Sequence, residues 1–233
     1  MGVGSRDIIL SRIRKNLIAD ESEGAFSRDA FLSAQFQRSA LQSADEKKGL
    51  FERFSDELTL VGGTVLQASS REELIASLGS ICRRENYRSV ILSREVFVET
   101  LRLEEGLRQQ VSEVRSLKSD IASLVDQLRG ADVGLTACEY LAAETGTVLL
   151  RSSPVAPRAL SLLPRAHIVV AREGQLLPTV AEGLQKTDAV ASPRSSCITL
   201  VTGPSRTADI EKVLVRGVHG PGELYVVFLG GPS

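Results

Sequence analysis

The sequence contains little of what metal centres and disulfide frameworks require. Its 233 residues include three cysteines, two histidines and no tryptophan. Cys82, Cys138 and Cys197 stand far apart, so sequence neighbours supply neither a disulfide framework nor a zinc or iron–sulfur site. We therefore expect three reduced, buried thiols and no metal site, and the sequence identifies no cofactor.

The chain also has almost no net charge and no long apolar run. Lys plus Arg is 28 against 29 for Asp plus Glu, and aromatic residues make up 4% of the chain, so neither polyanion attraction nor stacking on bases is favoured. The longest apolar run, 224–229, is far shorter than the ~20 residues that span a bilayer, and no signal-peptide pattern opens the chain. The sequence predicts a soluble cytoplasmic protein with no membrane span and no nucleic-acid partner.

Residues 1–58 are predicted to form an N-terminal helical arm. Apolar side chains keep helical spacing near the start, and a longer aromatic stripe includes Phe31, Phe36, Phe51 and Phe54. Such a stripe must be buried. It either packs on the same chain or forms a surface for a homodimer or a partner protein, in which case the chain is a regulatory or assembly module.

Residues 59–233 alternate between short apolar strands and helices. Ser70 and Glu73 form a capping box before a helix over 71–82, and a second helix is expected over 117–128. The expected strands are 61–66, 89–92, 132–136, 147–150, 166–170, 198–201 and 224–229. This alternation predicts an α/β fold with a mostly parallel sheet and helices on both of its faces.

Three polar, glycine-containing loops stand out in the last part of the chain. They read AETGT at 143–147, GPSRTADIE at 203–211 and GVHGP at 217–221, and PRALSLLP at 157–164 lies between them. In this order and spacing they resemble the LUD-domain family, and within it the lactate-utilisation protein C group. One departure is Tyr225, where the family pattern has a histidine.

The resemblance implies both a fold and a function. The fold is three-layered, similar to the ribose-phosphate isomerase and CoA-transferase (NagB/RpiA-like) group. The function is that of a subunit in a bacterial system that oxidises L-lactate to pyruvate together with iron–sulfur partner proteins, one A-like and one B-like.

The AETGT loop carries the first candidate site. Glu144 stands at a turn that enters a strand, where a carboxylate can act as a base, a nucleophile or a ligand to a substrate hydroxyl. A turn glutamate that accepts backbone N–H groups is the structural alternative. We place Thr145 and Thr147 beside Glu144 as ligand-binding residues. A free-standing transferase or hydrolase that uses Glu144 is the second function considered.

The GPSRTADIE loop is predicted to follow a strand and to open a helix over about 207–215. Free N–H groups at such a helix start, with the side chains of Ser205, Arg206 and Thr207, suit a small anionic ligand. Asp209 is grouped with these ligand-binding residues, although acidic residues in a first turn can instead serve only the helix dipole.

Histidine and arginine supply the remaining candidates. His219, in the glycine-flanked loop, titrates near neutral pH if unperturbed and is the second catalytic candidate. Arg151 and Arg158 flank a proline-bounded loop and can pair with a substrate carboxylate, whereas His167 is expected to be a hydrogen-bonded core or edge residue. We expect Glu144 and His219 to meet, with Ser205 and Thr207, at the carboxyl ends of the strands as an acid–base pair beside the anion site.

Overall fold

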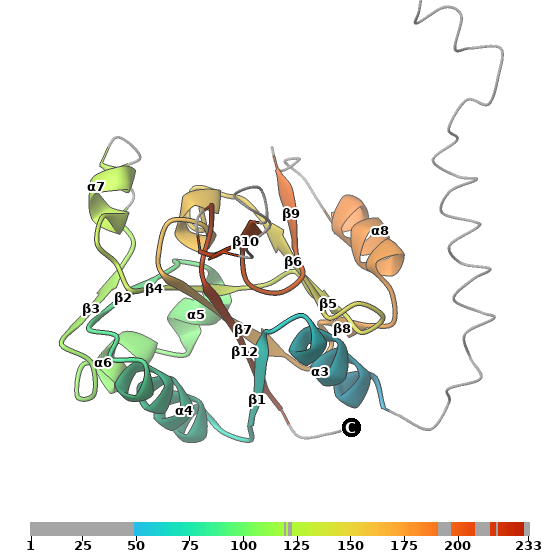
Figure 1. Cartoon of the computed structure of the whole chain (residues 1–233), viewed down its shortest axis with the longest axis horizontal. Coiled ribbons are helices and arrows are strands. Elements are labelled where there is room, and N and C mark those ends of the chain that lie inside the picture. Colours follow the sequence, from blue (N-terminus) through green and yellow to red (C-terminus); the bar gives the residue numbers. More distant parts are fainter. Residues whose placement is uncertain are drawn as a thin grey trace, which may run out of the picture. The chain divides into compact units, whose positions relative to one another are not determined.

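A computed structural model describes residues 49–118, 120, 123–190, 197–207, 215–217 and 219–230 (Figure 1). All of them lie in the second of the two units into which the chain divides, residues 46–233. The elements are α3 (Leu50–Leu60), β1 (Thr64–Ala68), α4 (Arg71–Arg84), β2 (Ser89–Leu92), α5 (Val96–Thr100), α6 (Leu103–Leu107), β3 (Glu113–Ser116), α7 (Leu124–Leu128), β4 (Val133–Ala137), β5 (Tyr140–Ala142), β6 (Thr147–Arg151), the 3₁₀ helix η2 (Arg158–Ser161), β7 (Ala166–Arg172), β8 (Leu176–Leu177), α8 (Val180–Val190), β9 (Ile198–Val201), β10 (Arg206–Thr207), β11 (Val215–Arg216) and β12 (Glu223–Leu229). No helix in the described ranges is long and apolar enough to cross a bilayer.

The main sheet has six strands in the order β1-β12-β7-β4-β2-β3. Every neighbouring pair is parallel, which confirms the predicted mostly parallel α/β sheet. All six strands therefore end at one edge, called here the carboxyl edge, and begin at the opposite one, the amino edge. Ligands of open parallel sheets usually bind at the carboxyl edge.

Both faces of the main sheet are covered. Helices α4, α5 and α6 bury one face in an apolar core that includes Leu74, Leu78 and Leu135. Helix α3 and a smaller four-stranded sheet, β8-β5-β6-β9, cover the other face (Figure 1). The sheet is thus the middle layer of three.

The capping signal at Ser70 is confirmed. The Ser70 side chain accepts a hydrogen bond from the Glu73 N–H at 3.2 Å, and α4 begins one residue later. Glu73 returns its bond to Ser69 rather than to the cap residue, with Oε2 accepting from the Ser69 N–H at 2.8 Å. The apolar stripe predicted after the cap lies in the core, where Leu74 is fully buried.

Two element boundaries differ from the prediction. Helix α3 extends to Leu60, so the first strand begins at Thr64, after a turn in which Gly62 has a φ of +87°. The helix expected over 117–128 is described as helical only at Leu124–Leu128, and β3 precedes it. Strand β3 was missed because it lies at the sheet edge and carries only one apolar residue, Val114.

The helix expected over about 207–215 is wrong at both ends. Thr207 belongs to β10 and Val215 to β11, and the two strands pair antiparallel. Asp209 lies outside the described residues.

Only the last part of the predicted N-terminal arm is described. In α3, Phe54 and Leu58 are fully buried against the sheet, and the Phe51 ring lies 5.3 Å from the ring of Phe228. Phe31 and Phe36 lie outside the described residues. A homodimer or partner surface on the arm stays a prediction.

Candidate functional site

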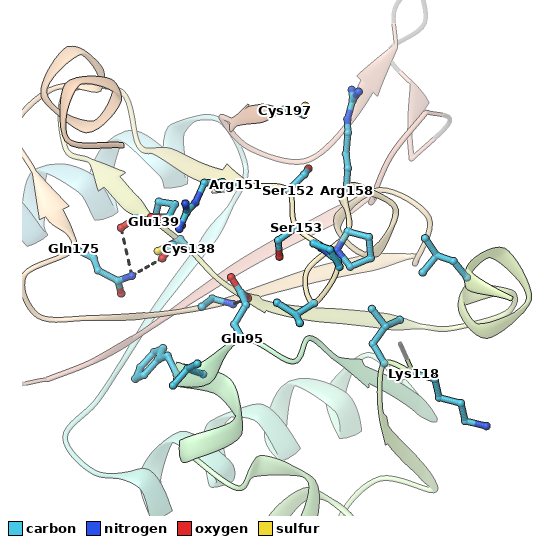
Figure 2. Close-up of a pocket in the computed structure, with 18 of the residues that line it drawn as sticks. Glu95, Lys118, Cys138, Glu139, Arg151, Ser152, Ser153, Arg158, Gln175 and Cys197 are labelled. Atoms are coloured by element: carbon cyan, nitrogen blue, oxygen red, sulfur yellow. Dashed lines mark hydrogen bonds and ion pairs between the residues drawn. The ribbon is translucent and has the colours of Figure 1, made fainter. Parts of the chain in front are cut away.

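A cavity of about 1060 Å³ opens at the carboxyl edge of the main sheet (Figure 2). Its walls come from residues that end or follow β2, β3, β4 and β7, together with the loop between β6 and η2. The charged side chains that line it are Glu95, Lys118, Asp120, Glu139, Arg151, Arg158 and Arg172. The topology explains where the cavity lies, because the residues that follow parallel strands all lie at the same edge of the sheet.

Glu95 is the most enclosed carboxylate of this cavity. Its Oε2 accepts hydrogen bonds from the Ser93 hydroxyl at 2.8 Å and from the Ala137 N–H at 2.7 Å. Burial raises the pKa of Glu95 from its ordinary value, and the negative charge of Glu139 raises it further, against the hydrogen bonds and the positive charge of Arg151. Oε1 forms no hydrogen bond with the described residues. Glu95 is therefore held in place through one oxygen and can exchange a proton with a ligand through the other.

Cationic side chains line the same cavity. Arg151 donates from Nε to Oε1 of Glu139 at 2.6 Å, which orients its guanidinium group. Arg158, at the start of η2, is exposed and forms no ion pair with the described residues. Figure 2 shows Glu95 on one wall and Arg151 and Ser153 across from it, whereas the Arg158 side chain extends away from Glu95. A carboxylate or phosphate ligand is suited to this arrangement.

Glu144 lies away from the cavity, at the start of α8. Its Oε1 accepts a hydrogen bond from the Val180 N–H at 2.8 Å, and its own N–H donates to the Pro178 carbonyl at 3.0 Å. The carboxylate thus satisfies one of the free N–H groups at the helix start. This is the arrangement of the structural alternative considered for Glu144.

Replacing Glu144 tests that arrangement. Glu144→Ala is expected to lower the free energy of unfolding by about 1–2 kcal/mol because a helix N–H loses its acceptor. Glu144→Gln retains an acceptor oxygen and is expected to change it much less. Urea denaturation followed by circular dichroism measures both, with Glu173→Ala as an exposed control. Equal stability of Glu144→Ala and wild type would contradict the capping role.

The two threonines beside Glu144 belong to a row of hydroxyl groups. The Oγ1 atoms of Thr145 and Thr147 are 2.6 Å apart, and Thr147 lies 2.7 Å from Thr202. Between them Gly146 has a φ of +61°, and a Cβ there would approach the Leu58 backbone nitrogen to 2.3 Å. The glycine of the AETGT loop thus allows this turn to pack closely against the end of α3.

The other two predicted loops meet each other at the amino edge. The Ser205 N–H donates to the Pro221 carbonyl at 2.9 Å, and the Gly217 N–H donates to the Ser205 carbonyl at 3.2 Å. Arg206 donates to the Val61 carbonyl, so its guanidinium group holds the turn before β1. Thr207 contributes its backbone to β10.

His219 lies at the opposite edge from the one predicted. It is exposed and lines a second cavity, of about 600 Å³, with Tyr87, Arg165 and Glu223 at the amino ends of the strands. Glu144 does not line this cavity. The expected convergence at the carboxyl edge is wrong for His219, because the chain reaches it through β10 and β11 rather than through a crossover helix.

His167 is a core residue, as predicted. It is 1% exposed, and its Nε2 lies 2.9 Å from the Thr136 hydroxyl. Burial lowers its pKa to about 4, so the ring is neutral near pH 7.

Comparison with known proteins places the chain in a family. The family model of the LUD domain matches residues 51–229. The chain belongs to the LUD domain family. Over 174 residues this LUD domain protein is 34% identical to the uncharacterized protein YkgG of Escherichia coli K12, covering 73% of this chain and 74% of that protein.

Two further comparisons cover most of this LUD domain protein. It is 28% identical over 220 residues to lactate utilization protein C of Halalkalibacterium halodurans, covering 93% of this chain and 94% of that protein. A crystal structure of a DUF162 family protein from Deinococcus radiodurans matches with a TM-score of 0.53 and 26% identity, covering 78% of this chain and 96% of that one.

Of the residues that the sequence analysis named for ligand binding or catalysis, Arg151 and Arg158 line the carboxyl-edge cavity. Glu95, Glu139 and Arg172 were not identified from the sequence. Their positions in the sequence could have indicated them. Glu95 and Glu139 are charged residues that follow buried strands by a few positions, and Arg172 is the last residue of a strand.

Proposed function

We propose that this LUD domain protein is a subunit of a lactate-utilisation system that oxidises L-lactate to pyruvate together with iron–sulfur partner proteins. The similarity to lactate utilization protein C of H. halodurans carries the proposal, because it extends over 93% of this chain and 94% of that relative. A match of that extent relates whole proteins rather than one shared segment.

The carboxyl-edge cavity supports the proposal. Lactate and pyruvate are small carboxylate anions, and Arg158 offers a guanidinium group that no described carboxylate neutralises. Oxidation of lactate to pyruvate releases two electrons and two protons. The partners receive the electrons, and Glu95, a half-buried carboxylate in the cavity, is placed to accept one of the two protons, while the other passes to solvent.

A growth experiment tests the proposed function. Deletion of the gene in its native host is expected to abolish growth on L-lactate and to leave growth on pyruvate unchanged, and the intact gene on a plasmid restores growth. Normal growth of the deletion strain on L-lactate as sole carbon source would overturn the proposal.

A further inference from the structure

Three of the charged residues that line the cavity also line a smaller space beside it. A narrow crevice of about 10 Å³ continues from the cavity. The residues that line both spaces are Glu95, Ala137, Arg151, Ser152, Pro157 and Arg158. We call these six residues the floor. Glu95, Arg151 and Arg158 thus border the same part of the cavity.

The floor has donors for a carboxylate. A guanidinium group is planar and presents paired N–H donors that match the two oxygens of a carboxylate. Arg158 forms no ion pair with the described residues, and the only described bond of the Arg151 side chain is from Nε to Glu139. The terminal N–H groups of both arginines are thus available to a ligand.

Glu95 gives the floor a group whose hydrogen-bonding role depends on its proton. An ionised carboxylate only accepts hydrogen bonds, whereas a protonated one also donates. Oε2 is occupied by Ser93 and Ala137, so Oε1 is the atom that meets a ligand.

We propose that the floor binds monocarboxylates that carry an oxygen at carbon 2, and that Glu95 selects between the 2-hydroxy acid and the 2-oxo acid through its protonation state. This inference rests on the proposed function, which supplies lactate and pyruvate as the pair. Ionised Glu95 accepts a hydrogen bond from the lactate hydroxyl. Protonated Glu95 donates one to the pyruvate carbonyl oxygen. Replacing bound lactate by pyruvate is therefore coupled to uptake of one proton by Glu95.

The direction of the pH dependence follows from the environment of Glu95. Burial raises its pKa above the ordinary carboxyl value, whereas the α-carboxyl groups of the ligands have pKa values below about 4 and are ionised above that pH. Raising the pH should therefore strengthen lactate binding and weaken pyruvate binding. The other charged or titratable groups that line the cavity are Lys118, Asp120, Cys138, Glu139, Arg151, Arg158, Arg172 and Cys197.

Isothermal titration calorimetry on the full chain tests the inference. L-lactate, pyruvate and acetate are titrated at pH 5.0, 6.5 and 8.0. The ratio of the pyruvate Kd to the lactate Kd is expected to rise about tenfold or more from the lowest to the highest pH. A hydrogen bond to a charged group contributes about 1.5–3 kcal/mol to binding, and about 1.4 kcal/mol corresponds to a tenfold change in Kd. Acetate, which lacks the oxygen at carbon 2, should show a much smaller change.

Two variants assign the effect to one residue. Glu95→Gln keeps an oxygen for Ser93 and Ala137 and places an uncharged amide at the floor, so its Kd ratio is expected to be independent of pH. Glu99→Gln, on the exposed side of α5, is the matched control and should behave as wild type.

Three results would overturn the inference: a constant Kd ratio in wild type, an unchanged pH dependence in Glu95→Gln, or no binding of lactate or pyruvate. None of them alters the growth phenotype on L-lactate. Failure of the selection at Glu95 and failure of the proposed function are therefore seen in separate measurements.

Discussion

Arg158→Ala is expected to weaken binding of L-lactate, pyruvate and acetate alike, by about 10- to 100-fold. The three ligands share a carboxylate, and a hydrogen bond to a charged group contributes about 1.5–3 kcal/mol. Because Glu95 remains, the pH dependence of the Kd ratio should persist. Titration calorimetry at pH 6.5 measures the loss, and thermal unfolding should be nearly unchanged since the Arg158 side chain is exposed.

Arg129→Ala is the control for this variant. Arg129 is equally an arginine on the surface, but it pairs with Asp126 and does not line the carboxyl-edge cavity. We expect wild-type affinities. Wild-type affinities in Arg158→Ala as well would show that the ligand carboxylate binds elsewhere.

Phe54→Ala is expected to lower the free energy of unfolding by about 3–5 kcal/mol, the usual cost of removing a buried aromatic ring. Phe54 is fully buried in the cluster that contains Leu141, Val148 and Phe228. Leu60, on the same helix, is 77% exposed, so Leu60→Ala should change stability by about 0.5 kcal/mol or less. Urea denaturation of both variants measures the difference. Equally small effects would mean that α3 does not pack on the sheet.

The strands of the main sheet could be predicted because burial on both faces makes them continuous apolar runs. Strand β2, Ser89–Leu92, has the predicted bounds, and β7 and β12 differ by one or two residues at their ends. Edge strand β3 could not be found in this way, since one of its faces carries charged side chains.

The site was harder to predict than the fold. The glycine-containing loops were predicted to carry the site, but their glycines allow tight backbone contacts, as Gly146 does against α3. Which edge of the sheet a loop reaches depends on whether the preceding segment crosses the sheet. The paired strands β10 and β11 keep the 217–221 loop at the amino edge, and local sequence does not reveal that pairing.

Nuclear magnetic resonance of the isotope-labelled full chain tests most directly whether the carboxyl-edge cavity is the ligand site. L-lactate is added stepwise, and the shifts of the backbone N–H groups are followed at each residue other than proline. We expect saturable shifts at Glu95, Ala137 and residues 151–158, with little change at residues 219–223. Saturable shifts confined to Ser205 and residues 219–223, at the amino edge, would contradict the assignment of the site.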